Sequence, residues 1–368
     1  MTKDQSLQSE GEQACGKPAT SPLLSRTECN LMRGFAIIII IIDNFAHLLR
    51  GVFLDNEYRY NIKAVNGFLN NLAHPDGLLP FNIISFYCPY GVMLFIFLSG
   101  YGLTLKYELG NGKGVSCKDF IFSHYNKMFT MHLKGLALFL TFYLIFNPTE
   151  TLNAVSVFLQ ALLVVNLSPY HIVYPGVYWF FGMIMEMYVI FRLFIYQRKD
   201  TLVVALIVLS LIAMAFAGPA GDATLYLRMN FCIAILPFCM GVLAARHLNS
   251  QFLSVHKGVV CLGWFVLSFI LLTLCKFNFF AWLLLPVFVI GTAVTIVKLI
   301  SRVRLLDGAF GWLGGLSGVL FVVHVTVRQV VLGNEKLDGY NYSAVAYYLV
   351  ITFGLCIMLR SVFSSKKE

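Results

Sequence analysis

The sequence is poor in charged residues. Only 12% of its 368 residues are Asp, Glu, Lys or Arg, whereas 58% are hydrophobic, and the mean hydropathy is +0.76. Soluble chains carry about 25% charged residues, so this chain has too little polar surface to solvate a folded body of its size. The composition excludes an ordinary soluble globular domain and indicates an integral membrane protein.

Recognisable cysteine patterns are also lacking. None of the nine cysteines forms a Cys-x-x-Cys pair, and five lie inside apolar runs, where cysteine usually behaves as a small hydrophobe. We therefore predict neither a disulfide nor a metal site, and no ligand set indicates a bound metal or flavin. No serine or cysteine stands in a recognisable activating motif for a covalent intermediate.

The start of the chain does not have the positive and then apolar layout of a signal peptide. Residues 1–30 are polar and contain two prolines, which predicts a disordered cytoplasmic tail. The first apolar segment is then expected to act as the insertion signal and to stay in the mature protein.

Apolar segments long enough to cross a bilayer recur along the chain. A helical span needs about 20 mostly apolar residues, and the weakest candidate, 151–168, is short and interrupted by polar residues. If that stretch lies in the interface or re-enters, about ten spans remain, and most Lys and Arg fall on the cytoplasmic side with both termini. We predict an all-α polytopic transmembrane helix bundle over 31–363, with a short cytoplasmic tail at 364–368.

The net charge of +9 is expected to lie in cytoplasmic loops rather than on a nucleic-acid-binding face, because no single run collects the basic residues. The segment 106–127, predicted to be a cytoplasmic loop, carries four lysines, including Lys127. These lysines could hold the phosphates of a nucleotide-bearing donor, or they could simply be the positive-inside signal.

The first span, RGFAIIIIIIDNFAHLLRG, carries four ionisable residues, of which Arg33, Asp43 and His47 concern the site. Asp43 lies ten residues after Arg33, about 15 Å along a helix, which predicts a position near the midplane. His47 follows one turn later on the same face, where the carboxylate could orient the imidazole as a general base. The alternative interpretation is a buried ion pair or a helix-packing contact.

Two later spans carry polar stripes of the same kind. Trp179 and Glu186 share a face of 177–196, and His324 shares a face of 311–332 with Ser317 and Arg328. Ionisable groups inside spans usually mark functional sites, so we expect one polar cavity among these helices, although a lone histidine is often only a hydrogen-bonded core residue. The second of these spans also has a small-residue face that favours close helix packing, formed by Gly311, Gly314, Gly315 and Gly318.

Several stretches together resemble the acyltransferase 3 family of bacterial membrane acyltransferases, in family order and over about residues 31–361. They are Arg33-Gly-Phe-Ala, Tyr90-Gly-Val-Met-Leu-Phe-Ile-Phe-Leu-Ser-Gly-Tyr, Tyr178-Trp-Phe-Phe with Glu186 and Tyr188, Leu236-Pro-Phe-Cys-Met-Gly-Val-Leu-Ala-Ala, and Leu313-Gly-Gly-Leu-Ser-Gly-Val-Leu-Phe-Val-Val-His324.

The resemblance implies an O-acyltransferase of the bacterial inner membrane. Such an enzyme moves an acyl group, often acetyl, from cytoplasmic acyl-CoA as co-substrate to a hydroxyl of a surface glycan or its lipid-linked precursor. The alternatives from other classes are a secondary transporter of a small polar solute, whose inverted repeats we do not find, and a catalytically silent family member.

The family's first helix has an arginine followed ten or eleven residues later by an essential histidine. Here Asp43 and Asn44 stand at those positions, and His47 is similar to a second histidine of some members. Three hypotheses stay open: His47 is the base with Asp43 as its partner, Asp43 itself accepts the proton, or the chemistry is lost.

The resemblance also implies roles for residues beyond this pair. We expect Arg33 and Lys127 to bind the donor, Asn44 to contact the substrate, and Trp179, Glu186 and His324 to line the same chamber.

Overall fold

The computed structural model describes residues 21–57, 59–147, 151–168, 173–252, 257–333, 337 and 342–363. Within these ranges the chain is helical, with isolated bridges and no strand. The α-helices are α1 (Arg26–Ala46), α2 (Ile62–Ala73), α3 (Leu79–Tyr87), α4 (Gly91–Leu103), α5 (Cys117–Phe146), α6 (Ala154–Ala161), α7 (Trp179–Ile190), α8 (Asp200–Ala217), α9 (Asp222–Met229), α10 (Phe231–His247), α11 (Gly258–Cys275), α12 (Phe279–Trp282), α13 (Leu285–Ile300), α14 (Arg304–Thr326) and α15 (Tyr342–Phe363).

Short turns of wider or tighter helix extend several of these elements. The π-helical turns are η1 (Thr104–Leu109) after α4, η4 (Phe191–Ile195) after α7 and η6 (Val327–Val331) after α14, and the 3-10 turns are η2 (Val165–Leu167) and η3 (Gly176–Tyr178).

The described residues contain nine helical segments that are long and apolar enough to cross a membrane, together with the shorter apolar helix α13. These ten correspond in order to the ten predicted spans. The stretch 151–168 forms the eight-residue α6 and η2, and eight residues rise only about 12 Å, too little to span. The protein is therefore a polytopic helical membrane bundle.

Two predicted boundaries differ from the structure. Helix α1 begins at Arg26, because Ser25 and Glu28 form a capping box there, so the last residues of the predicted tail are helical. Residues 1–20 and 364–368 lie outside the described part. Helix α5 begins at Cys117, where the Ser116 side chain caps the Asp119 amide, so Lys127 lies on a helix rather than in a loop.

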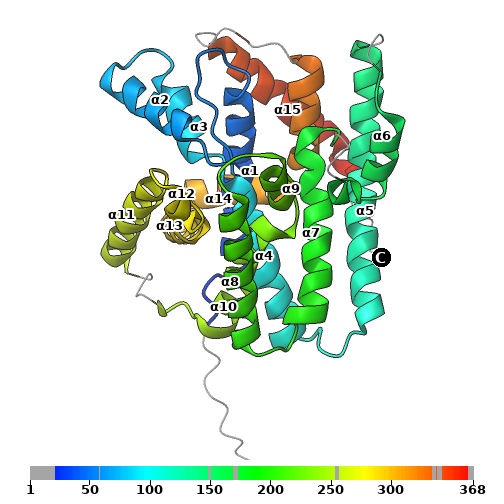
Figure 1. Cartoon of the computed structure of the whole chain (residues 1–368), viewed down its shortest axis with the longest axis vertical. Helices are drawn as coiled ribbons and strands as arrows, with labels where there is room; N and C mark the ends of the chain where they lie inside the picture. Colours follow the sequence, from blue (N-terminus) through cyan, green and yellow to red (C-terminus); the bar gives the residue numbers. More distant parts are fainter. Residues whose placement is uncertain are drawn as a thin grey trace, which may run out of the picture.

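Helix α1 packs in the middle of the bundle against α14, with α5 along one side of the molecule and α11 along the other (Figure 1). Glycines make the α1–α14 contact close, because a Cβ at Gly34 would overlap the Phe310 carbonyl and one at Gly314 would overlap the Asn30 carbonyl. Of the four predicted small residues of α14, Gly314 makes this contact with α1.

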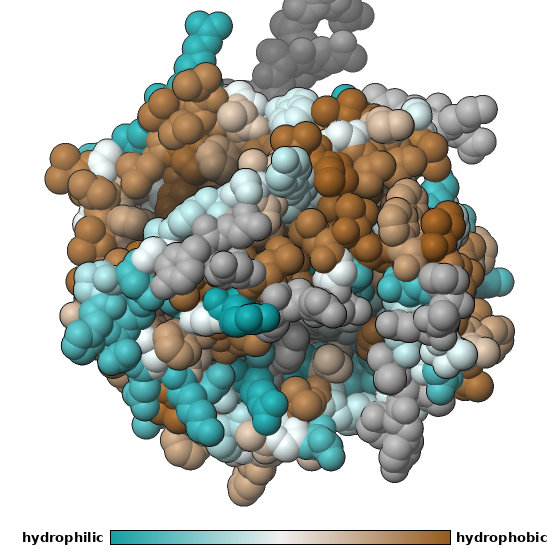
Figure 2. All heavy atoms as spheres, turned by 90° about the horizontal axis from the view of Figure 1, so that it is seen from above, coloured by the Kyte–Doolittle hydropathy of each residue, from teal (hydrophilic) through white to brown (hydrophobic). Residues whose placement is uncertain are grey.

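The outside of the bundle is apolar. Large hydrophobic side chains such as Phe216, Val259 and Leu305 are more than three-quarters exposed, and hydrophobic atoms cover much of the face seen in Figure 2. A contiguous apolar surface of this kind would aggregate in water. It fits contact with lipid.

Candidate active site

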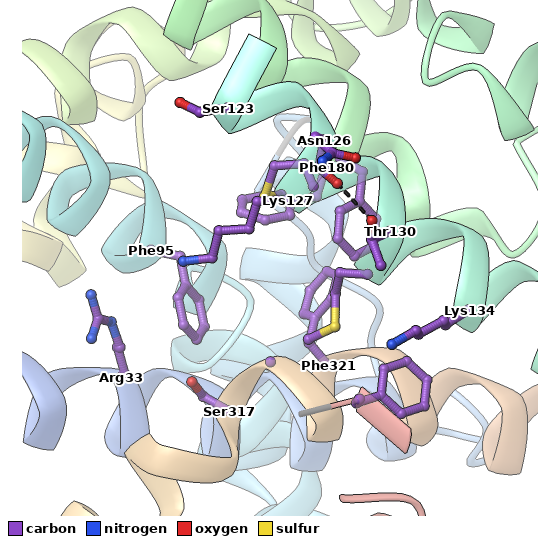
Figure 3. A pocket seen from close by; sticks show the side chains of 15 residues that line it. Arg33, Phe95, Ser123, Asn126, Lys127, Thr130, Lys134, Phe180, Ser317 and Phe321 are labelled. Atoms are coloured by element: carbon purple, nitrogen blue, oxygen red, sulfur yellow. Dashed lines mark hydrogen bonds between the residues drawn. The ribbon is translucent and has the colours of Figure 1, made fainter. Parts of the chain in front are cut away.

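A cavity of about 590 Å³ opens between α1, α4, α5, α7 and α14. Figure 3 shows Arg33 and Ser317 on one side of it and Lys127, Thr130 and Lys134, all from α5, on the other. Its apolar lining comes mainly from aromatic and methionine side chains, namely Phe95, Met128, Met131, Phe180, Phe181, Phe321 and Phe363.

The charges that line this large cavity are all positive. Arg33, Lys127 and Lys134 contribute cations, and no described acidic residue lines it. The Lys134 Nζ donates to the Val362 carbonyl at 2.7 Å, which ties α5 to the end of α15. The cavity therefore suits an anionic ligand with an apolar portion, and it brings together the predicted pair Arg33 and Lys127.

A second cavity, of about 30 Å³, lies further along α1. Asp43, Asn44 and Glu57 supply its polar lining, and Ile40, Pro89, Val92, Val177 and Phe321 supply the apolar part. Asp43 is the eighteenth residue of the 21-residue α1, so this small cavity belongs to the end of the helix opposite Arg26.

Asp43 and His47 are close, as their spacing predicts. The His47 Nε2 lies 3.6 Å from the Asp43 Oδ1, and the side chains are 20% and 7% exposed. Asn44 is held by two contacts, because its amide donates to the Ile40 carbonyl at 2.9 Å and its oxygen accepts from Arg328 at 3.4 Å. Arg328 comes from η6, and π-helical turns are frequent at functional sites.

Sequence reasoning missed a set of buried charges beside Asp43. Lys276 forms an ion pair with Asp55 at 2.7 Å, with both side chains almost fully buried, and Tyr90 donates to the same carboxylate at 3.2 Å. Asp55 and Glu57 belong to the segment after α1, which returns into the bundle and brings both carboxylates close enough to interact with Asp43. The sequence does not predict that this segment folds back into the bundle, and only the tertiary structure shows it.

Phe321 lines both the large cavity and the small cavity. Its ring packs against Phe180 and Phe181 of α7, with centroids 5.2 and 5.7 Å away. The predicted single chamber is thus two cavities with the Phe321 ring between them.

Four predicted site residues line neither cavity: His47, which lies beside Asp43, and Trp179, Glu186 and His324. Glu186 accepts from the Phe231 amide at 2.9 Å and so caps the start of α10. Trp179 is a buried core residue, and the neighbouring Phe180 and Phe181 reach the large cavity instead.

His324 is fully buried behind Phe321, with ring centroids 5.8 Å apart. Its Nδ1 donates to the Leu320 carbonyl at 3.0 Å. No described residue hydrogen-bonds its Nε2. His324 is therefore placed to support Phe321 rather than to line the large cavity.

Comparison with protein-family models matches residues 26–360 to a model of the acyltransferase 3 family, described as an acyltransferase domain. The chain belongs to the acyltransferase 3 family. The match begins at the first residue of α1 and ends within α15, so one acyltransferase domain takes in every helix that contributes to the two cavities. The protein is a multi-pass membrane acyltransferase.

Searches of curated proteins and of solved structures returned no match.

Proposed function

We propose that this acyltransferase moves an acyl group, acetyl in the simplest case, from cytoplasmic acyl-CoA to a hydroxyl of a surface glycan or its lipid-linked precursor at a bacterial inner membrane. The observation that carries the proposal is the large cavity, because it joins three cations to an aromatic interior. Acyl-CoA has the matching chemistry, with phosphates at one end and a slender pantetheine arm that carries the thioester at the other.

The direction of the arm follows from α1. Arg33 lines the large cavity and Asp43 lines the small one, and ten helical residues separate them by about 15 Å. Phosphates held at Arg33 and Lys127 would let the arm lie along α1, with the thioester directed towards Phe321. The acceptor would reach Asp43 and His47 from the outer side.

The chemistry is a direct transfer. Because Asp43 lies beside the Nε2 of His47, it leaves Nδ1 as the nitrogen that accepts the proton of the acceptor hydroxyl. The acceptor oxygen attacks the thioester carbonyl, the carbon–sulfur bond breaks, and the CoA thiolate leaves and takes a proton from cytoplasmic water. Asp43 stabilises the imidazolium that forms.

The decisive experiment supplies labelled acetyl-CoA to the cytoplasmic side of membrane vesicles from the source cells, which contain the native acceptors. Label is expected in the glycan or lipid fraction, and mild alkali should release it because it is held as an ester. Label that never leaves CoA, or uptake of a free solute without acyl transfer, would contradict the proposal and favour a transporter.

Removing one cation from the large cavity is expected to weaken donor binding. Arg33→Ala and Lys127→Ala should each raise the Kd for CoA about tenfold or more, because a hydrogen bond to a charged group contributes about 1.5–3 kcal/mol. Binding to purified protein is measured by the thermal shift on titration with CoA. Lys118→Ala is the matched control, since Lys118 is exposed on the same helix and does not line the cavity. Equal affinity in all four proteins would exclude this cavity as the donor site.

Shortening Phe321 is expected to open a passage between the two cavities. Phe321→Leu should raise the ratio of acyl-CoA hydrolysis to acyl transfer severalfold, because water from the Asp43 side can then reach the thioester. Both products are counted from one labelled donor. Phe310→Leu on the same helix lines neither cavity and should leave the ratio unchanged; a ratio unchanged in both variants would show that Phe321 is not the partition.

A further inference from the structure

Glu57 lies outside the sequence stretches that carry the family resemblance. It lies eleven residues beyond the end of α1, is half-buried, and lines the small cavity together with Asp43 and Asn44. It also lines a still smaller space of about 10 Å³ beside Trp282 and Met93. Glu57 is thus a lining residue of both small spaces.

The small cavity has the size and lining of a water site. A buried water needs about 10–15 Å³ and two to four polar partners, and this cavity offers about 30 Å³ with two carboxyls and one amide. The Asp43 residue is only 5% exposed. Its Oδ1 accepts no hydrogen bond from any described residue, although it lies in reach of this space.

The surrounding charges leave one negative charge uncompensated. Asp43 faces the acids Glu57 and Asp55 and the bases Lys276 and Arg328, and Glu57 also faces Asp55. Lys276 forms an ion pair with Asp55, so these two charges balance each other. Of the two bases, Arg328 then remains to balance the carboxyls of Asp43 and Glu57. The other titratable groups nearby are His47, Cys88 and Tyr90. Two carboxyls that share one site cannot easily ionise together, so one proton stays between them.

We propose that Asp43 and Glu57 form a water-bridged acid pair that shares one proton, and that Glu57 is the route by which the acceptor's proton leaves to the outer side. The second half of this inference rests on the proposed function; the existence of the pair does not. The substrate end of the route is His47 and the solvent end is the half-buried Glu57.

The proton balance is simple. His47 takes the proton from the acceptor hydroxyl as the new ester bond forms, and passes it to the acid pair, which then holds two protons. Glu57 releases one of them to outer water and restores the singly protonated pair. The CoA thiolate takes its own proton from the cytoplasmic side, so each turnover releases one proton outside and consumes one inside.

Thermal stability tests the pair without any acyl transfer. Burial, with the nearby Asp55 charge adding to it, raises the pKa of Glu57 to about 8. A carboxyl whose folded pKa is raised contributes stability that is complete below its unfolded pKa and is lost as the pH rises through the folded value. The Tm of the purified full-length protein should therefore fall as the pH rises from about 4.5 to about 8 and level off above that.

Three variants make this test specific. In Glu57→Gln the Tm should not fall over this pH range, and in Asp43→Asn the fall should end at a lower pH because no proton is then shared between two carboxyls. Asp222→Asn, which replaces an exposed acid at the start of α9, should behave like the wild type. The proposed pair would be overturned if the plots of Tm against pH coincide for the wild type and Glu57→Gln. It would also be overturned if the Tm of Asp43→Asn falls over the same pH range as that of the wild type.

Kinetics then test the exit route. Glu57→Gln should lower kcat about tenfold or more with the KM for acyl-CoA unchanged, and Glu57→Asp should recover part of the loss. An unchanged kcat in Glu57→Gln would overturn the route. If wild-type vesicles transfer no acyl group at all, the proposed function and the exit route both fail, while the Tm profiles still decide whether the acid pair exists.

Discussion

Replacing His47 and Asp43 together by alanine is expected to lower kcat of acyl transfer by about 10²–10⁴-fold, the usual contribution of a positioned general base. The structure places the two side chains 3.6 Å apart at the Asp43 end of α1, so they should act as one unit. Their single replacements should therefore be strongly non-additive. The rate is measured with labelled acetyl-CoA and native membranes.

The single variants separate the hypotheses that the sequence leaves open. A near-complete loss in His47→Ala with a smaller loss in Asp43→Asn identifies His47 as the base, and the reverse order identifies Asp43. His247→Ala serves as the control, because its imidazole pairs with Asp200 at an exposed site away from both cavities. Undiminished transfer by the double variant would remove this pair from the mechanism.

The largest loss of stability is expected from Lys276→Met. The lysine is 1% exposed, pairs with Asp55 at 2.7 Å and lies over the Phe86 ring at 3.7 Å, so its removal leaves a buried carboxylate without its cation. Breaking such a pair costs about 3–5 kcal/mol. Thermal unfolding of the purified protein should show a large fall in Tm.

Removing both charges should cost much less than removing one. Lys276→Met with Asp55→Leu replaces the ion pair by apolar groups, which is often close to neutral in stability, so its Tm should recover most of the loss. Lys63→Met, at an exposed position in the first turn of α2, is the control and should leave Tm unchanged. A double variant as unstable as Lys276→Met would show that the lysine stabilises the fold by some other contact.

Local patterns predicted the bundle and two of the proximities in the candidate site. The order of the ten apolar helices follows from segment length alone, because a span must satisfy its backbone internally. The four-residue spacing of Asp43 and His47 fixes their proximity through helix geometry. Arg33 and Lys127 were expected to act together, and they line one cavity.

Contacts between distant segments could not be predicted in this way. Asp55 and Glu57 look like ordinary loop acids in the sequence, and only the return of their segment into the bundle places them beside Asp43 and Lys276. Glu186 was predicted to contact the substrate, and the structure shows its carboxylate accepting a hydrogen bond from the Phe231 amide at the start of α10.

For a related reason, the sequence did not predict which aromatic side chains of α7 line the large cavity. The pattern singled out Trp179 as the residue facing the chamber, whereas Phe180 and Phe181 face the large cavity. In an almost wholly apolar helix such as α7, the pattern of polar and apolar residues does not show which face points into the bundle. Packing against α5 and α10 therefore decides which side chains point inward, and the rings of Phe180 and Phe181 then meet Phe321 of α14.

The central claim is that an acyl group entering beside Arg33 and Lys127 reaches Asp43 past Phe321. An acyl-CoA analogue with a photoreactive diazirine on its acyl chain tests this most directly, with crosslinked residues mapped by mass spectrometry after illumination. The account predicts crosslinks on Phe321 and on the residues of the small cavity near Asp43, which Arg33→Ala and excess CoA should abolish. Crosslinks confined to the lipid-facing surface, or crosslinks that excess CoA does not reduce, would contradict it.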